Sequence, residues 1–405
     1  MKKLLLFTIL AGTISTVSYG QFSEFTDNPS SFTLSSDKNT LQIGGRIAFY
    51  YENRFLKSGY TNLAHNGFDV KDMDLDVQGH TASKFTYEVH YSLIDIITAA
   101  TTQNTAAPMS PGFKAAYIQY DGFKIHIKFG YDKVPFSQSN LSHEHETPNW
   151  SHPNLTGGDL YSRRDLGITL NTSLWKKRIN LYAGAYSGLG ETVFQYGGDA
   201  SGTFEYVGRA EFSYPSKMSY NTIDEQNSPI LHFRVAANAR YEDKTQPGGA
   251  TILSGYPDAV GVYNTYMISG KRTIYGGDAL LMYRGLSLTI EDVIMNMHPS
   301  SQSDPLYNGT KSTVNNGVVN AGGFISSLSY DWLKAKSVFT VGYENTNPDD
   351  LIPGHMEWLT LGYAYTLNSF NSCAKVEYYI PTVEDVIQKP TKYTGQLRIG
   401  YQIVF

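Results

Sequence analysis

Charged residues occur at every second position in several short segments of the chain. In one segment Lys124, His126 and Lys128 alternate with isoleucine and phenylalanine. A repeat of two residues places alternate side chains on opposite faces of a β-strand, so each such strand has one apolar face and one charged face. The charged faces and adjoining strand ends supply the candidates for contact with a polar solute, which are Arg46, Asp72, Asp74, Asp76, Lys124, Lys128, Arg163, Arg164, Arg209, Arg234 and Arg398.

Histidines cluster in one polar segment, which reads His143-Glu144-His145-Glu146 and has His152 close behind it. Neutral imidazoles and carboxylates are ligands for Zn²⁺ or Ni²⁺. The spacing is not the His-Glu-x-x-His of zinc proteases, and Pro148 opposes the helix which that motif requires. We therefore expect a solvated polar loop without a metal or other cofactor, and a metal-binding loop built on His143, His145 and His152 is the alternative.

Motifs for covalent catalysis are missing from the sequence. There is no Gly-x-Ser-x-Gly element, and the single cysteine, Cys373, lacks the context of a catalytic nucleophile. One cysteine also excludes intramolecular disulfides. Basic residues do not cluster with aromatic ones and the formal net charge is −5, so a nucleic-acid partner is not expected. The chain is expected not to be an enzyme, and Cys373 is assigned no role.

The first twenty residues have the layout of a secretory signal. Lys2 and Lys3 precede an apolar stretch, and the small residues Ser18 and Gly20 precede an expected cleavage before Gln21. No later segment offers eighteen consecutive apolar residues for a transmembrane helix. No linker or shift in composition marks a boundary between domains.

Alternating segments recur along the rest of the chain, and we count sixteen of roughly the length that a tilted membrane-spanning strand requires. They are expected near residues 41–51, 68–79, 84–95, 113–120, 124–131, 164–173, 178–186, 203–213, 230–241, 272–283, 286–295, 318–329, 333–343, 357–367, 374–380 and 393–405. The predicted organisation is a signal peptide over residues 1–20, a short lead-in over 21–39 and a single barrel over 40–405.

The connections between these segments alternate between short and long. Asp121-Gly122, Arg284-Gly285 and Asp331-Trp332 are expected to be tight turns, whereas the third long connection covers residues 132–163. Tyr214–Pro229 is long where a short turn is due. Short turns at one end and long loops at the other are typical of an outer-membrane barrel, and an even number of antiparallel strands closes without an edge. We therefore predict an all-β transmembrane antiparallel barrel of about sixteen strands in the outer membrane of a Gram-negative bacterium, with lipid around it.

A barrel of this size encloses a lumen that side chains do not fill. A charge on the lipid face costs about 2–4 kcal/mol at the bilayer midplane, so the charged faces are expected to point inward. A wet, charge-lined lumen predicts passive diffusion of ions and small hydrophilic solutes. Two arrangements stay open: the basic residues form a ladder for anions such as phosphate, or the carboxylates pair with them in a general pore. A non-conducting adhesin or structural barrel is the alternative from another class.

One stretch of the chain, Phe123–Leu170, resembles the phosphate-selective porin O and P family of sixteen-stranded outer-membrane channels. The matching positions are Gly130, Lys133, Pro135, Phe136, Arg164 and Gly167. The resemblance implies a homotrimer, a third loop (132–163) folded inward to narrow the pore, and a terminal aromatic residue, Phe405, that the barrel-assembly machinery reads. Family members often carry arginines on the second strand, where this chain has Asp72, Asp74 and Asp76, so phosphate selectivity is not carried over.

Overall fold

The computed structural model describes most of the chain. The described residues are 31–36, 38–57, 66–94, 112–153, 160–188, 190, 203–244, 270–300, 318–347, 350, 355–384 and 393–405. The expected signal peptide, residues 1–20, lies outside them, as does the first part of the lead-in. None of the helices in the described part is long and apolar enough to cross a membrane.

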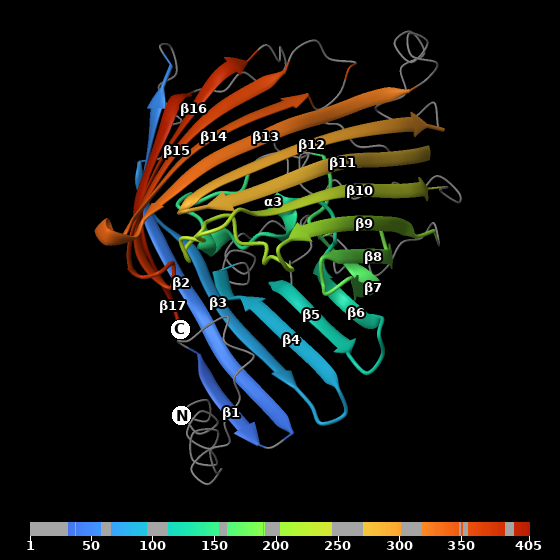
Figure 1. Cartoon of the computed structure of the whole chain (residues 1–405). Helices are drawn as coiled ribbons and strands as arrows, with labels where there is room; N and C mark the ends of the chain where they lie inside the picture. Colours follow the sequence, from blue (N-terminus) through green and yellow to red (C-terminus); the bar gives the residue numbers. More distant parts are fainter. Residues whose placement is uncertain are drawn as a thin grey trace, which may run out of the picture.

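Sixteen antiparallel strands close into a barrel (Figure 1). The strands are β2 (Asn39–Leu56), β3 (Gly67–His80), β4 (Phe85–Ser92), β5 (Phe113–Tyr120), β6 (His126–Lys133), β7 (Arg164–Leu174), β8 (Ile179–Tyr186), β9 (Glu205–Tyr214), β10 (His232–Lys244), β11 (Gly270–Tyr283), β12 (Leu286–Pro299), β13 (Val319–Trp332), β14 (Ser337–Asn347), β15 (Met356–Asn368), β16 (Ser372–Glu384) and β17 (Tyr393–Val404). Each strand pairs with the next one in sequence, and β17 pairs with β2 to close the ring. The predicted barrel and its strand number are confirmed.

Burial alternates along the strands as the sequence pattern requires. On β3, Asp72 and Asp74 are buried inside the barrel, whereas Leu75 between Asp74 and Asp76 is 41% exposed on the outside. On β6 the outward-facing Phe129 is 60% exposed. Large exposed apolar side chains are stable on this surface because lipid surrounds it, and the polar faces are left to the lumen.

A seventeenth strand, β1 (Phe32–Ser36), lies outside the ring and pairs with Asn39–Ile43 of β2. Strand β17 ends at this level, where the backbone N–H of Phe405 donates to the carbonyl of Gly45 at 2.9 Å. Strand β1 therefore pairs with the part of β2 that the C-terminus leaves open (Figure 1). The sequence analysis assigned no strand to this lead-in, because a pairing that depends on where another strand ends leaves no local pattern.

Two turn assignments were wrong. Strand β13 continues through Asp331 and Trp332, and the turn is instead a 3₁₀ helix, η4 (Leu333–Ala335). Strand β6 begins at His126, so Lys124 lies exposed in the preceding turn and not on a strand. In that turn the Asp121 carboxylate accepts hydrogen bonds from Gln119 at 2.7 Å and from the His126 ring at 2.5 Å.

Substitutions at Leu170 and Asn171, adjacent residues of β7, can test which face of the strand contacts lipid. Leu170 is 40% exposed on the outer face, whereas Asn171 borders a cavity in the lumen. We expect Leu170→Arg to lower the free energy of unfolding in lipid vesicles by about 2 kcal/mol or more, because it moves a cation into hydrocarbon. The matched control, Asn171→Arg, should change it by less than half as much in the same urea titration. Equal losses for the two variants would contradict the assignment of the faces.

Candidate functional site

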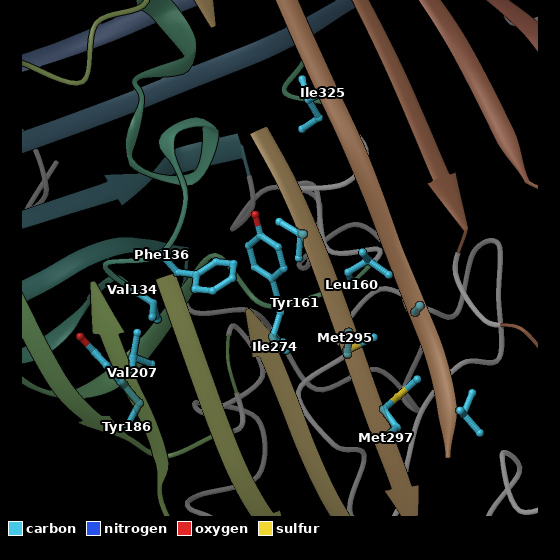
Figure 2. Close-up of a cluster of buried hydrophobic side chains, with 13 residues drawn as sticks. Val134, Phe136, Leu160, Tyr161, Tyr186, Val207, Ile274, Met295, Met297 and Ile325 are labelled. Atoms are coloured by element: carbon cyan, nitrogen blue, oxygen red, sulfur yellow. The ribbon is translucent and has the colours of Figure 1, made fainter. Parts of the chain in front are cut away.

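The described part of the third loop, residues 134–153 and 160–163, folds into the barrel and packs against one side of the wall. Phe136, Leu160 and Tyr161 of this loop are fully buried. They belong to one apolar cluster with inward-facing residues of β9, β11, β12 and β13, including Ile274 and Met295 (Figure 2). This part of the lumen is therefore a packed core rather than a water-filled space.

Polar contacts fix the short helix α3 (Gln138–Leu141) of the loop against the same wall. The backbone N–H and hydroxyl of Ser139 donate to the Glu291 carboxylate of β12 at 3.0 and 2.7 Å. The backbone N–H of Ser137 donates to Asn238 of β10 at 3.2 Å. Buried polar groups are stable only when they are paired, so these contacts define one position for the helix.

The loop then crosses to the opposite wall. The backbone N–H of Trp150 donates to Glu377 of β16 at 3.2 Å, and the carbonyl of His145 accepts from Lys375 of β16 at 3.2 Å. On β15 the loop approaches so closely that a Cβ added to Gly362 would lie 2.2 Å from the Asn149 side chain. The third loop thus spans the lumen from the β9–β13 wall to the β15–β17 wall.

A second segment enters the barrel from the end with the short turns. It is the connection between β9 and β10, residues 215–231, which the sequence marked as anomalously long. The carbonyl of Tyr220 accepts a hydrogen bond from Gln138 of the third loop at 2.8 Å. Further along, Ile223 is buried with Val338, Ala364 and other residues of the β14–β16 wall. The β9–β10 segment therefore meets the third loop inside the lumen and also reaches the far wall.

Two cavities remain beside these segments. The larger, about 640 Å³, is lined by residues of β2–β8, the third loop and the β9–β10 segment, and we call it the charged chamber. Its charged lining consists of six cations and five carboxylates, which are Arg46, Lys114, Lys128, Lys133, Arg163, Arg164, Asp74, Asp76, Glu88, Asp132 and Glu146. The smaller, about 260 Å³, lies against β12–β17, and eleven of its lining residues are serine or threonine. We call it the neutral chamber.

Ion pairs dominate the charged chamber. The guanidinium of Arg46 lies 3.1 Å from Asp72 and 2.8 Å from Asp74. The Lys114 ammonium lies 3.0 and 3.1 Å from the same two carboxylates, and Lys128 pairs with Asp132. Asp72 and Asp74 of β3 are therefore paired with the side chains of Arg46 and Lys114 and are not bare acids.

A second group of ion pairs lies in the dry part of the lumen. Arg209 pairs with Asp278 at 2.6 Å, and Arg240 pairs with Glu205 at 2.5 Å, with all four side chains almost fully buried. Charges this deeply buried persist because each has an opposite charge and hydrogen bonds. They brace the wall beneath the third loop and are shielded from a diffusing solute.

Comparison with known proteins fits this architecture. The sequence model of the phosphate-selective porin O and P family matches residues 41–278, which is more than half of the chain. The chain belongs to this family of porins. No curated protein matches it.

Solved structures similar to this porin have the same fold at low sequence identity. The outer-membrane channel DcaP of Acinetobacter baumannii is 11% identical with a TM-score of 0.55, and the match covers 92% of this chain and 99% of that one. An anion-selective porin from Comamonas acidovorans is 9% identical (TM-score 0.53, 91% and 100% covered). OmpT of Vibrio cholerae in a trimer form is 12% identical (0.52, 91% and 100%).

Family and fold together confirm the predicted class of function. This porin is a channel of the bacterial outer membrane for passive diffusion. The third loop and the β9–β10 segment occupy part of its lumen.

The candidate residues from the sequence fall into four groups in the porin. Those beside the charged chamber are Arg46, Asp74, Asp76, Lys128, Arg163 and Arg164, with Asp72 buried in an ion pair next to them. Arg398 borders the neutral chamber, and Lys124 lies in a turn. Arg209 and Arg234 are buried, with the Arg234 guanidinium 4.3 Å from the centre of the Tyr220 ring.

Lys114 was not among the lumen residues predicted from the sequence. It is the extra residue of a bulge in β5, where His90 of β4 pairs with Ala115 and Tyr91 pairs with Phe113, and the bulge brings Lys114 into the lumen out of phase with its neighbours. The register shift is a property of the pair of strands, so alternation within β5 alone could not indicate it.

The histidines of the third loop serve as contacts within the lumen. The His145 ring lies 3.0 Å from the Arg46 guanidinium, and His152 lies 2.8 Å from Arg163. In the described part of the chain no group of three histidine, cysteine or acidic side chains is arranged to hold a metal ion. The metal-binding alternative therefore has no geometric support there.

The His145–Arg46 contact predicts a pH dependence of the loop. Burial and the neighbouring Arg46 hold the pKa of His145 well below 6.5. Because packing lowers the pKa of His145, the imidazole binds more protons at pH values below about 6.5 when the loop is released than when it is packed. The packed position of the loop therefore loses stability as the pH falls below about 6.5. We expect single-channel current noise to rise between pH 7.5 and pH 5, and His145→Asn, which keeps a neutral acceptor, to reduce that rise. The same rise in the variant would exclude His145 as its source.

Proposed function

We propose that the channel conducts small ions of both signs and small polar solutes, with only a weak preference for charge. The observation that supports this is the balance of the charged chamber, which has six cations against five carboxylates. Paired charges on a lumen wall offer contacts to either sign and strong binding to neither.

The charged chamber is the proposed path for diffusion. Its lining extends from Lys133 and Arg163, at the long-loop ends of β6 and β7, to Gln78, close to the short turn that follows β3. A solute that follows this lining passes the Arg46–Asp74 pair midway along β2 and β3.

A preference for anions is the second candidate. Lys133, Arg163 and Arg164 lie together where the third loop leaves and rejoins the wall, so an entering solute meets cations first. The similar porin of Comamonas acidovorans is described as anion-selective. The aspartates of β3 oppose such a preference further along the path.

Reversal potential in a planar bilayer with a salt gradient distinguishes the two candidates. We expect a value near zero for the natural protein. Asp74→Asn combined with Asp76→Asn should shift it toward anion selectivity, because the chamber loses two carboxylates and Lys114 keeps Asp72 but no longer pairs with Asp74. Lys128→Gln should shift it the other way.

A matched control removes a carboxylate outside both chambers. Asp243→Asn breaks only an exposed contact of 3.8 Å with Lys271 at the barrel rim and should leave the reversal potential unchanged. A strongly anion-selective natural channel would favour the second candidate. A folded barrel without any conductance would refute diffusion altogether and favour an adhesin or structural barrel.

We further propose that the channel assembles as a homotrimer through the barrel-assembly machinery, with Phe405 as the recognised terminus, and that it has no catalytic role. The trimer rests on family membership and on the similar fold of OmpT, which is described in a trimer form.

Closure steps test the trimer. Under a large applied voltage each inserted unit should close in three equal steps, since three barrels close independently. The folded protein should also have about three times the 45.1 kDa mass of one chain in native mass measurement, allowing for signal removal. One closing step for each insertion, with a monomer mass, would rule the trimer out.

A further inference from the structure

The outer wall of the neutral chamber follows one lateral row of paired residues. The register places Thr289 of β12 opposite Ser327 of β13, Ser327 opposite Gly342 of β14, and Gly342 opposite Thr360 of β15. Directly opposed residues on one face of a sheet have their Cβ positions about 5 Å apart. Four adjacent strands thus present three hydroxyls and one open position, all facing the same cavity.

These three hydroxyls are available to a ligand. Those of Thr289, Ser327 and Thr360 form no hydrogen bond with another group of the described residues. In the neighbouring row, by contrast, Ser329 and Thr340 bond to each other at 2.7 Å. A hydroxyl can donate one hydrogen bond and accept two, so this row offers unsatisfied donors and acceptors side by side.

The row continues onto β16, which contributes an aromatic ring, and the charged side chains at the edge of the chamber are paired with one another. Tyr379 of β16 lies opposite Thr360 and packs against Trp358, with ring centres 6.2 Å apart. At the edge of the chamber Arg398 pairs with Glu52 at 2.8 Å and lies 3.5 Å from Glu377. The chamber therefore offers hydroxyls and a ring face to a solute but little uncompensated charge.

On the side of the short turns the chamber borders the β9–β10 segment. Thr222 and Ile223 of the β9–β10 segment line it there, and Ile223 is buried in an apolar cluster with Phe370 and Cys373. On the side of the long loops its lining ends at Arg54 and Gln396, near the outer ends of β2 and β17. The lining of the neutral chamber thus extends from the outer ends of β2 and β17 to the β9–β10 segment, whereas that of the charged chamber continues to Gln78, near the short turn after β3.

We propose that the neutral chamber is a binding site for an uncharged polyhydroxylated solute of about monosaccharide or disaccharide size, which enters from the long-loop side. Sugar hydroxyls match a row of donor–acceptor side chains, and the apolar face of a sugar ring packs on an aromatic side chain such as Tyr379. The volume of about 260 Å³ lies just below the roughly 300 Å³ at which small-molecule sites usually start, so a monosaccharide is the better match. This inference deepens the proposed diffusion function by assigning one class of solute to one part of the lumen.

Saturation-transfer NMR on the folded, detergent-solubilised protein tests the site, with methyl α-glucoside and maltose as probes. The natural protein should give a saturable signal from one or both. Gly342→Phe should remove it by filling the chamber, since a Cβ at Gly342 makes only ordinary contact with Thr360 at 3.7 Å. Should that variant fail to fold, Ser327→Ala combined with Thr360→Val removes two hydroxyls at nearly constant volume and should weaken binding by about tenfold, a loss of roughly 1.4 kcal/mol.

A matched substitution in the charged chamber is the control. Asn171→Leu changes a polar lining residue there and should leave the sugar signal intact. Inorganic phosphate should not displace the sugar, because the chamber has little net charge. Equal signals in all variants, no signal in the natural protein, or displacement by phosphate would overturn the proposal.

Conductance measurements on the same preparations distinguish the absence of a sugar site from the absence of diffusion through the channel. Ion current with no saturable sugar binding would leave diffusion standing and remove the sugar site. Sugar binding lost in Gly342→Phe, without ion current in any variant, would support the site and refute diffusion through the charged chamber.

Discussion

The architecture depends on one constraint: every backbone N–H and C=O in the hydrocarbon must have a partner within the protein. Antiparallel pairing satisfies these groups between strands, and only closure satisfies the first and last strands. In this chain closure joins β17 to β2, strands from opposite ends of the sequence. The inside and outside of the barrel follow from that closure, because alternation then assigns each side chain either to lipid or to the lumen.

The third loop and the β9–β10 segment divide the lumen. The third loop brings aromatic residues to inward-facing apolar positions of β9–β13, and together they form a core where a plain barrel would hold water. The β9–β10 segment meets the loop from the other end through the Gln138–Tyr220 hydrogen bond. A pore of this strand number would be wide, and these two segments leave one charged and one neutral space beside them.

Ion pairs occur both in the dry core, where they stabilise buried charges, and along the proposed path for diffusion. In the dry core, Arg209 and Arg240 are balanced by Asp278 and Glu205, which buried charges require. In the charged chamber the paired lysines Lys114 and Lys128 remain partly exposed, so they are accessible to ions, whereas Arg46 and Asp74 are almost as buried as the pairs of the dry core.

The sequence by itself determined the barrel, its sixteen strands and the direction of most side chains, because a period of two and alternating connection lengths are local patterns. It also singled out residues 215–231 as anomalous without indicating their role. Only the tertiary structure placed β1 beside β2, brought Lys114 inward through a bulge, and lined up Thr289, Ser327 and Thr360 in one row. It also showed which charges are paired and which are buried under the loop. These features depend on the register between strands and on loops packing inside the lumen, and no single segment encodes either of them.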